Sequence, residues 1–438
     1  MHSVSPRINK APFCPNEIRG VMIVDPNAAF GKKLWRFLGP GMLVAVGYMD
    51  PGNWATDIQA GSAFGYSLLS VILFSSLTAI LLQYLAARLG IVSGKDLARL
   101  SRDHHPKPVR FFLWFLAEIA IIACDLAEVL GCALAFHLLL GVPVIWGVVL
   151  TILDTVIILG LQGRNFRTLE AIVLGLIATI AICFFTELVI VRPLWPEVLE
   201  GFKPPLHLLE NGNAVMLAVG IVGATVMPHN IYLHSSVVNT RRMGVTRKIK
   251  KETIRFATID AVLCLAFAFL INCAILILAS AAFHASGHRV TEIQDAYMLL
   301  NPVVGSALAA PLFGLALLAA GQSSTFTGTV AGQVIMDGFL NIKIPVWQRR
   351  LITRSLALIP ALLGISYAGE QAIGTMLVLS QVVLSLQLPF AVFPLLRFSG
   401  RADVTKNMQA PRKFLVLAWM AFAVIVSGNV WMLVSLLK

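Results

Sequence analysis

The sequence predicts an all-α polytopic membrane protein with eleven spans, and three observations support this prediction. The chain has 438 residues, of which 58% are apolar and 13% are charged, whereas a soluble domain has roughly 45–50% apolar and about 25% charged residues. Its basic residues are concentrated in alternate connections between long apolar segments. Two of these segments are interrupted by similar motifs that contain proline.

Eleven apolar segments are long enough to cross a bilayer, which requires about 18 or more apolar residues. They cover approximately residues 36–63, 65–90, 110–139, 142–162, 168–191, 212–238, 255–283, 303–338, 351–368, 371–396 and 413–437. Residues 1–33 are polar and contain no short apolar core before a small-residue cleavage site, so we expect a cytoplasmic tail and no signal peptide. Residues 34–438 are expected to form one transmembrane transporter domain.

The distribution of lysine and arginine predicts the orientation of the chain. Of the 34 basic residues, 30 lie in the tail, in the connections that follow even-numbered spans or at the adjoining span ends. The other side has only Arg192, Lys203, Arg289 and Lys438. Because cytoplasmic loops are enriched in basic residues, we predict a cytoplasmic amino terminus and an extracytoplasmic carboxyl terminus. The net charge of +12 is then a topological signal, and we expect no nucleic-acid partner.

Spans one and six contain breaks of the same form. The first reads "DPGN" at residues 50–53 and the second "MPHN" at residues 227–230, with proline second and asparagine fourth in both. Five spans separate the two breaks, so the halves have opposite orientations in the membrane. One such proline would indicate an ordinary kink. Two matched breaks instead predict an inverted repeat with a discontinuous helix in each half, which is typical of a transporter with its site near the membrane midplane.

The two breaks offer groups that suit a divalent metal ion. Asp50 and Asn53 supply side-chain oxygens, and Met227 supplies a thioether. Each proline lacks the N–H that the carbonyl four residues earlier would accept, which frees the carbonyls of Gly47 and Ala224. Oxygen ligands alone would suit Mg²⁺ or Ca²⁺, whereas a thioether prefers softer transition metals. The mixed set predicts Mn²⁺ or Fe²⁺, although a lone methionine in a membrane span usually packs in the core.

Span three carries three acidic residues, Glu118, Asp125 and Glu128. Their spacing places them on one helical face over about 15 Å. Ionisable residues inside the membrane are functional hypotheses by default, and we interpret these as a proton pathway. The alternative is a structural network paired with a cation such as Arg350. His229 titrates near neutrality when unperturbed, so it is a further proton carrier or, alternatively, a neutral residue that lines the cavity.

Other polar residues in the spans carry simpler predictions. Glu170 and Glu187 lie near span ends, where snorkelling or pairing at the surface suffices, and no role is predicted for Asp154 or Asp260. None of the six cysteines forms a C-x-x-C pair, and we expect most of them to be small buried hydrophobes. The run of Gly, Ser and Thr in span eight predicts close helix packing.

The motifs resemble those of bacterial members of the Nramp family of proton-coupled divalent metal transporters. The matching segments are "DPGN" at 50–53, "DLAEVLG" at 125–131, "GATVMPHN" at 223–230, "GQSSTFTGTVAGQVIMDGF" at 321–339 and "SQVVLSLQLPF" at 380–390. The resemblance covers approximately residues 34–437 and implies a LeuT-type fold. In that fold, spans one to five and six to ten form the two repeats, at about 34–192 and 210–397, and an eleventh span lies outside them at about 413–437.

The resemblance also implies roles for individual residues. By motif, the metal ligands are Asp50, Asn53, Met227 and the carbonyl of Ala224, with Gln381 added in the occluded state. The family often has alanine where Gly47 stands, but a backbone carbonyl does not depend on the side chain, so the Gly47 carbonyl is retained. Magnesium-selective relatives lack the methionine. The family also supports Arg350 as a partner of the acidic residues.

Together these observations predict secondary active, proton-coupled import of Mn²⁺ or Fe²⁺ by alternating access across a bacterial inner membrane. One alternative is a sodium-coupled amino-acid carrier on the same fold, although Asp50 would repel the substrate carboxylate. Another is a divalent metal channel. The sequence contains no H-E-x-x-H motif and no phosphate-binding loop, so we expect neither an enzyme nor direct use of ATP. We expect no cofactor and no obligatory protein partner, only metal ions, protons and the bilayer.

Overall fold

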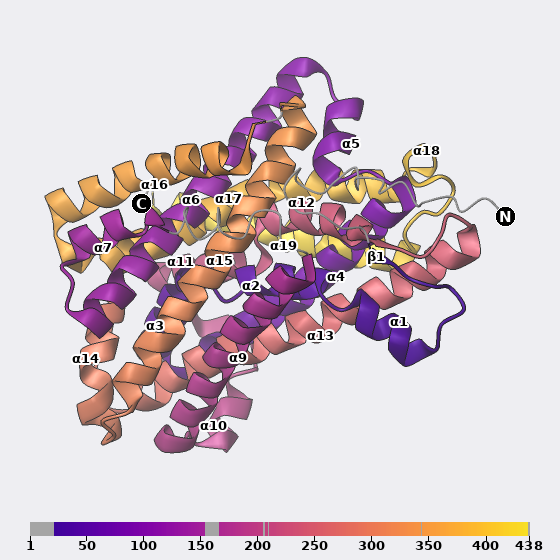
Figure 1. Ribbon diagram of the computed structural model, residues 1–438. Coiled ribbons are helices and arrows are strands. Elements are labelled where there is room, and N and C mark those ends of the chain that lie inside the picture. The colour runs from indigo at the N-terminus through magenta and orange to yellow at the C-terminus, as the bar shows by residue number, and fades with distance from the viewer. Residues whose placement is uncertain (1–21, 154–165, 205, 209, 343, 437–438) are drawn as a thin grey trace.

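The structure, a computed structural model, describes residues 22–153, 166–204, 206–208, 210–342 and 344–436, and these are almost entirely helical (Figure 1). The elements of the first half are β1 (Met22–Ile23), α1 (Phe30–Phe37), α2 (Pro40–Gly47), α3 (Pro51–Phe64), η1 (Gly65–Leu68), α4 (Leu69–Ser93), α5 (Leu97–His104), α6 (Lys107–Leu140), α7 (Val144–Leu150), α9 (Phe166–Val191), α10 (Trp195–Glu200) and η2 (Leu206–Leu208).

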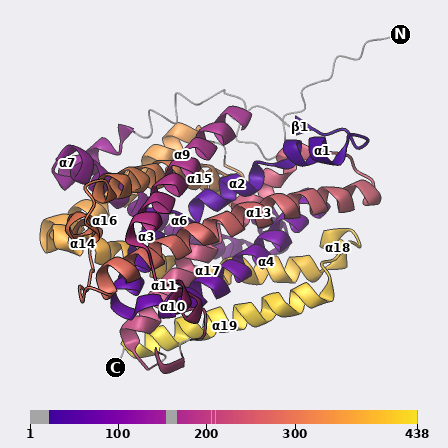
Figure 2. The ribbon, with the colours of Figure 1, turned by 90° about the horizontal axis from the view of Figure 1, so that it is seen from below.

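The second half begins with the other interrupted helix. Its elements are α11 (Gly212–Val226), α12 (Pro228–Val237), η3 (Val238–Thr240), β2 (Arg241–Arg242), α13 (Arg247–Ala279), η4 (Ser280–His284), α14 (Ile293–Val304), α15 (Ala309–Leu340), α16 (Val346–Ala368), η5 (Glu370–Ala372), α17 (Ile373–Gly400), α18 (Ala402–Thr405) and α19 (Arg412–Leu436). The short strands β1 and β2 pair in parallel. Along the bundle, α1, β1 and α18 lie at one end, and α7 and α14 lie at the other (Figures 1 and 2).

Nine helical segments among the described residues are long and apolar enough to cross a membrane. One of them, Pro51–Ser93, contains the second part of predicted span one and all of span two. Predicted span four, at 142–162, lies partly outside the described residues. The total of eleven spans and the boundaries of the domain and its repeats therefore remain predictions.

Span eight begins later than the sequence predicted. The segment around residue 303 belongs to α14, and the long helix α15 starts only at Ala309. Gly305 ends α14 with a φ of 71°, a left-handed conformation that glycine adopts without steric cost. The prediction joined the two helices because their composition is continuously apolar.

Both predicted breaks interrupt their helices at the expected positions. The first separates α2 from α3, and the second separates α11 from α12. Each proline occupies the first turn of the helix that follows it, where its fixed φ is suitable and its missing N–H would have no helical partner in any case. The interrupted helices lie inside the bundle, with α2 and α3 against α13, and α11 against α17 and α4.

Glycines on α15 allow the close packing that the sequence predicted for span eight. An ideal Cβ on Gly321 would lie 2.4 Å from Cys132 Sγ, and one on Gly328 would lie 2.9 Å from Glu128 Oε1. One on Gly332 would lie 2.6 Å from a guanidinium nitrogen of Arg349. Polar side chains of neighbouring helices thus lie in the space that larger residues on α15 would fill.

The predictions of surface pairing for Glu170 and Glu187 were wrong. Glu170 is buried and forms an ion pair with buried Arg241, because strand β2 brings the arginine back to the start of α9. Glu187 is 1% exposed, and neither oxygen of its carboxyl group has a hydrogen-bond partner. This face of α9 turns into the bundle, and within the described part of the chain no basic side chain forms an ion pair with Glu187.

Asp260, which had no predicted role, fixes the start of α2. Its carboxylate lies on α13 and accepts hydrogen bonds from the backbone N–H groups of Gly39 at 3.2 Å and Gly41 at 2.6 Å. These N–H groups lie at the first turn of a helix, where no helical carbonyl is available to them. Asp260 therefore caps α2 from a neighbouring helix. Asp154 lies outside the described residues.

We predict that Asp260→Ala lowers the free energy of unfolding by about 1–2 kcal/mol, because two buried N–H groups lose their acceptor. The measurement is thermal unfolding of the purified protein in detergent. Thr258→Ala on the same helix is the control, since the Thr258 hydroxyl donates only to the Ile254 carbonyl of its own helix. Equal effects of the two changes would contradict a capping role for Asp260.

Candidate metal-binding site

The two breaks lie side by side, and hydrogen bonds join them. Oδ1 of Asp50 accepts from the backbone N–H and from the side-chain amide of Asn53, both at 2.8 Å. The same Asn53 amide donates to the carbonyl of Ala224 at 3.1 Å. The carboxylate, the amide and the freed carbonyl, which come from sequence positions about 170 residues apart, therefore meet at one place. This is the arrangement expected of two facing discontinuous helices.

Met227 lies against the end of α2. An ideal Cβ on Gly47 would lie 3.2 Å from Met227 Sδ and 2.4 Å from Nδ2 of Asn230. That Asn230 amide lies 3.5 Å from the thioether sulfur and 3.4 Å from the Val44 carbonyl. The missing side chain at Gly47 thus leaves room for Asn230 to hold the methionine sulfur. Asn230 was not among the predicted site residues, although it is the last residue of the second motif.

Gln381 reaches the same region from α17. An ideal Cβ on Gly52 would lie 1.7 Å from Nε2 of Gln381, so the amide packs directly on the first turn of α3, two residues from Asp50. Its nitrogen donates to the hydroxyl of Ser380 at 2.9 Å. The structure therefore places all six predicted ligand residues around the two breaks.

These residues are closed off from solvent. Asp50, Ala224, Met227 and Gln381 are 0% exposed, and Asn53 is 1% exposed. Yet Oδ2 of Asp50 and Oε1 of Gln381 have no hydrogen-bond partner among the residues that the structure describes. Leaving a buried acceptor unsatisfied costs about 1–3 kcal/mol, and more for a charged group. Two unsatisfied oxygens from different helices are thus available to a cation.

The helix ends add to the electrostatic character of the site. The carbonyls of Gly47 and Ala224 lie four residues before Pro51 and Pro228, which have no N–H to donate. The carboxyl ends of α2 and α11 carry partial negative charge, which favours a cation. Met227, between α11 and α12, has a φ of 39° and a ψ of 102°, and such sparsely populated backbone conformations often occur at ligand sites.

The donor set is unusual for a protein metal site. No group of three or more His, Cys, Asp or Glu side chains in the described part of the chain could hold a metal ion. The site instead combines one carboxylate with amide oxygens, a thioether and backbone carbonyls. It could be recognised in the sequence only through the paired proline breaks, because clustered metal-binding residues are absent from it.

The acidic residues of α6 face a row of arginines on α16. Glu118 pairs with Arg349 at 2.9 Å, and Arg350 pairs with Asp125 and, at 3.3 Å, with Glu128. The pairs follow the same order along both helices, which agrees with two odd-numbered spans that cross the membrane in the same direction. The ion pairs with Arg350 that the sequence analysis considered are therefore present, and Arg349 adds a further one.

Arg354 was missed by the sequence analysis. Its guanidinium lies 3.9 Å from the carboxylate of Glu128 and 3.4 Å from the backbone carbonyl of Asp125. Arg349 and Arg354 are 4% and 0% exposed. The signal was available, because three arginines within six residues at the start of a span are rare and match three carboxylates in another span.

Cys124 connects this network to the second break. Its sulfur lies 3.6 Å from Oε1 of Glu128 and 3.8 Å from Nε2 of His229. His229 is two residues from Met227, 1% exposed, and its Nδ1 has no hydrogen-bond partner. The sequence predicted buried, unpaired cysteines, and Cys124 is free and buried. Its place between a histidine and a carboxylate was not predicted, since nothing in its local sequence indicates it.

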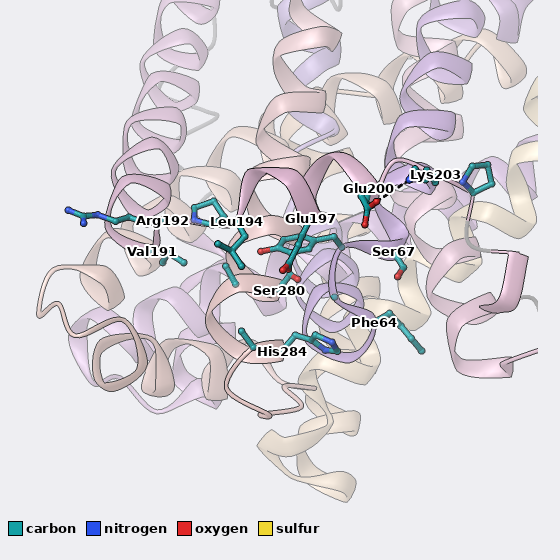
Figure 3. Close-up of a pocket in the computed structure, with 17 residues that line it drawn as sticks. Phe64, Ser67, Val191, Arg192, Leu194, Glu197, Glu200, Lys203, Ser280 and His284 are labelled. Atoms are coloured by element: carbon teal, nitrogen blue, oxygen red, sulfur yellow. Dashed lines mark hydrogen bonds and ion pairs between the residues drawn. The ribbon is translucent and has the colours of Figure 1, made fainter.

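A cavity of about 590 Å³ lies away from the two breaks and is lined by the carboxyl end of α9, by α10 and by η4. Lys203 forms an ion pair with Glu200 at 3.1 Å. In Figure 3, Glu197 lies beside Ser280, and Arg192 points away from the cavity. None of the predicted ligand residues lines this cavity. The site between the breaks and this cavity are therefore separate features.

Comparisons with known proteins agree with this geometry. The model of the Nramp family, described as natural resistance-associated macrophage protein-like, matches residues 41–435. The divalent metal cation transporter MntH of Ralstonia nicotianae is 59% identical over 429 residues, which is 98% of this chain and 97% of the relative. MntH 1 of Pseudomonas aeruginosa is also 59% identical over 429 residues, which is 98% of each chain.

Solved structures support the same conclusion. A manganese transporter of Eremococcus coleocola, in complex with an aromatic bis-isothiourea substituted compound, has a TM-score of 0.88 and 36% identity, covering 96% of this chain and 90% of its own. MhsT in complex with L-phenylalanine has a TM-score of 0.59 and 17% identity, covering 89% of this chain and 98% of its own, which shows a shared fold alone. The predicted LeuT-type fold is confirmed. The chain belongs to the Nramp family and is a membrane transporter rather than an enzyme.

Proposed function

We propose that the chain imports Mn²⁺ or Fe²⁺ together with protons, by alternating access. The observation that carries this proposal is the buried meeting of Asp50, Asn53, Ala224 and Met227, with unsatisfied oxygens on Asp50 and Gln381. A single carboxylate supplies charge for a divalent ion, and the thioether favours transition metals over Ca²⁺ and Mg²⁺. Relatives named divalent metal cation transporters, at 59% identity, support the same class of substrate.

Burial of the proposed ligands favours alternating access over a channel. Every proposed side-chain ligand is at most 1% exposed, so an ion held there is shielded from both faces. Release of the ion requires the surrounding helices to move. The helices that flank the breaks, such as α2 and α12, are shorter than a full span. In transporters with discontinuous helices, alternating access moves one repeat or bundle against the other around the fixed site.

Protons are proposed to use the groups that lead away from the second break. His229, Cys124 and Glu128 form a continuous series of contacts, and Arg350 joins Glu128 to Asp125. Glu118, paired with Arg349, lies further along α6. Buried carboxylates and histidine can carry protons, whereas arginine stays charged and orients its partners. The neutral, cavity-lining role of His229 and a purely structural role of the ion pairs are the alternatives that the experiments below distinguish.

The proposed location is a bacterial inner membrane, with the amino terminus in the cytoplasm and the carboxyl terminus outside. The concentration of basic residues on one side of the predicted bundle supports this orientation. No cofactor and no obligatory protein partner are proposed. The sodium-coupled amino-acid carrier is disfavoured, because the Asp50 carboxylate lies at the unwound helix ends where a substrate carboxylate would bind.

The central experiment is uptake into proteoliposomes of Mn²⁺ or Mg²⁺, with and without an inward pH gradient. We expect uptake of Mn²⁺ in preference to Mg²⁺, stimulation by the gradient, and acidification of the vesicle interior during Mn²⁺ uptake. Equal uptake of the two metals would contradict the proposed selectivity. A metal flux unaffected by the gradient would contradict proton coupling and leave metal transport in place.

Asp50→Asn is expected to abolish metal uptake, because it removes the only formal negative charge among the proposed ligands. The fold should persist, since the two side chains are nearly isosteric, and thermal stability is measured alongside transport. Asp403→Asn, which removes an exposed carboxylate in the connection after α17, is the control. Near wild-type Mn²⁺ uptake by Asp50→Asn would place the metal site elsewhere.

Met227→Ala is expected to lose selectivity more than transport, because the remaining ligands are hard oxygens. Inhibition of Mn²⁺ uptake by excess Ca²⁺ measures this change. The inhibitory Ca²⁺ concentration should fall by roughly tenfold, which corresponds to about 1.4 kcal/mol. Unchanged competition would count against a thioether ligand.

Glu128→Gln is expected to separate the two transported ions. Glutamine keeps the size and the hydrogen bonding but cannot carry a proton, so metal binding should persist while acidification and the pH dependence of uptake fall. If Glu128 only anchors arginines, metal and proton transport should fall together, with reduced thermal stability. Glu118→Gln, at the far end of the same network, is the matched variant. Normal coupled transport by Glu128→Gln would exclude both roles.

A further inference from the structure

Helix α1 is attached to the bundle through one apolar face. Leu34 and Phe37 pack in a small cluster with Val24, Met243 and Phe256. This cluster is separate from the main hydrophobic core, and it includes residues from β1, the β2 region and α13. In both views α1 lies at the periphery of the bundle, beside α13 (Figures 1 and 2).

The opposite face of α1 combines an aromatic ring with positive charge. Lys32, Trp35 and Arg36 are three and four residues apart, so they share one side of the helix. All three are exposed, Trp35 by 69%. Ile23, on the adjoining strand, is 73% exposed, and its carbonyl accepts from the Arg36 guanidinium at 3.3 Å. Tryptophan flanked by lysine and arginine is typical of helices that lie at a membrane–water interface.

Contacts with α13 place α1 at the depth of that interface. The first nine residues of α13, 247–255, read "RKIKKETIR", and from Phe256 onward the helix is predominantly apolar. The centroid of the Phe256 ring lies 5.2 Å from the ring centroid of Phe30 and 5.4 Å from that of Phe37. The Arg255 guanidinium lies 5.8 Å from the Phe30 ring. Helix α1 therefore packs where α13 changes from basic to apolar, which is where a span leaves the hydrocarbon region.

The surroundings of α1 are strongly basic. Exposed basic residues of α1, β2 and the first turns of α13 are Lys32, Arg36, Arg242, Arg247, Lys248, Lys251 and Arg255. The nearby acidic residue Glu252 is paired with Lys33 at 2.6 Å, which leaves Asp25 as the exposed acidic residue of the segment that leads into α1. A surface with this excess of positive charge is complementary to anionic lipid headgroups.

We propose that α1 and the basic start of α13 form a binding surface for anionic phospholipids of the adjacent leaflet. Trp35 enters the headgroup region, and Lys32 and Arg36 contact the phosphates beside it. Each basic side chain near such a surface contributes roughly a fivefold increase in binding.

The surface is connected to the proposed metal site through a short path. Only Leu38 and Gly39 separate α1 from α2, and α2 ends at Gly47, whose carbonyl is a proposed ligand. Anchoring of α1 therefore restrains the half-helix that must move when metal is released. This consequence for transport rests on the proposed function, whereas lipid binding itself does not.

The first test measures lipid binding without transport. The reconstituted full-length protein is placed in phosphatidylcholine vesicles that contain a minor fraction of brominated phosphatidylglycerol or, separately, brominated phosphatidylcholine. The Trp35 signal is the difference in fluorescence between the wild type and Trp35→Phe, because the chain has eight tryptophans. We expect stronger quenching of this signal by the anionic lipid. Equal quenching by both lipids would overturn the proposal, and a signal that depends on protein density would indicate self-association instead.

The second test removes the charges. In Lys32→Gln/Arg36→Gln, the preference of Trp35 quenching for the anionic lipid should fall by roughly fivefold or more. The control is Arg412→Gln/Lys413→Gln, which removes two exposed charges at the start of α19 and should keep the preference. If both variants lose the preference for the anionic lipid, the preference arises from the overall charge of the protein, and the proposal of a specific binding surface at α1 is wrong.

The third test is Mn²⁺ uptake in vesicles with and without phosphatidylglycerol. We expect the anionic lipid to change the uptake rate of the wild type and of the Arg412→Gln/Lys413→Gln control, and to leave that of Lys32→Gln/Arg36→Gln unchanged. An identical lipid response in all three proteins would overturn the connection to transport. Absence of Mn²⁺ uptake in every lipid would contradict the proposed function, while the quenching experiment would still decide lipid binding.

Discussion

A backbone carbonyl inside a membrane must have a partner, because hydrocarbon supplies no hydrogen bonds. The two prolines that follow Asp50 and Met227 violate this requirement twice, at Gly47 and at Ala224. The protein meets the requirement by placing the two interruptions against each other in the interior. There the Asn53 amide donates to the Ala224 carbonyl, and a cation can interact with oxygens that have no hydrogen-bond donor. Two interrupted helices are tolerated in a membrane only when other helices cover them, which explains why they lie in the interior of the bundle.

The charged network between α6 and α16 meets a similar requirement, because its polar groups also need partners inside the membrane. Asp125, Glu128 and three guanidinium groups are buried within the bundle, and Glu118 is partly buried. Burial of these charges is costly unless each has a partner. The partners are present in matching order, and α15 lacks side chains at Gly328 and Gly332, where the network needs space. A requirement for space, set by polar groups on other helices, therefore explains why a membrane helix contains so many small residues.

Most residues of the candidate site could be identified from the sequence, whereas fewer of the residues around it could be. The paired breaks identified Asp50, Asn53 and Met227, because a proline in a span is a local signal with a strong physical consequence. Gln381 came from family resemblance alone, since an isolated glutamine in a span has no local signal. Cys124 was missed because its role arises from contacts between distant segments. Arg354 and Asn230 were missed although each lies in a segment that the sequence analysis had already singled out. The separation of α14 from α15 was also missed, since a single glycine ends one helix within a continuously apolar stretch.

Gly47 leaves space that the Asn230 side chain occupies. The Asn230 amide occupies the position that a methyl group at residue 47 would take, at 2.4 Å. A change of Gly47 to alanine therefore displaces the end of the Asn230 side chain from its place beside the methionine sulfur. In chains with alanine at position 47 we expect the sulfur to be held in a different way.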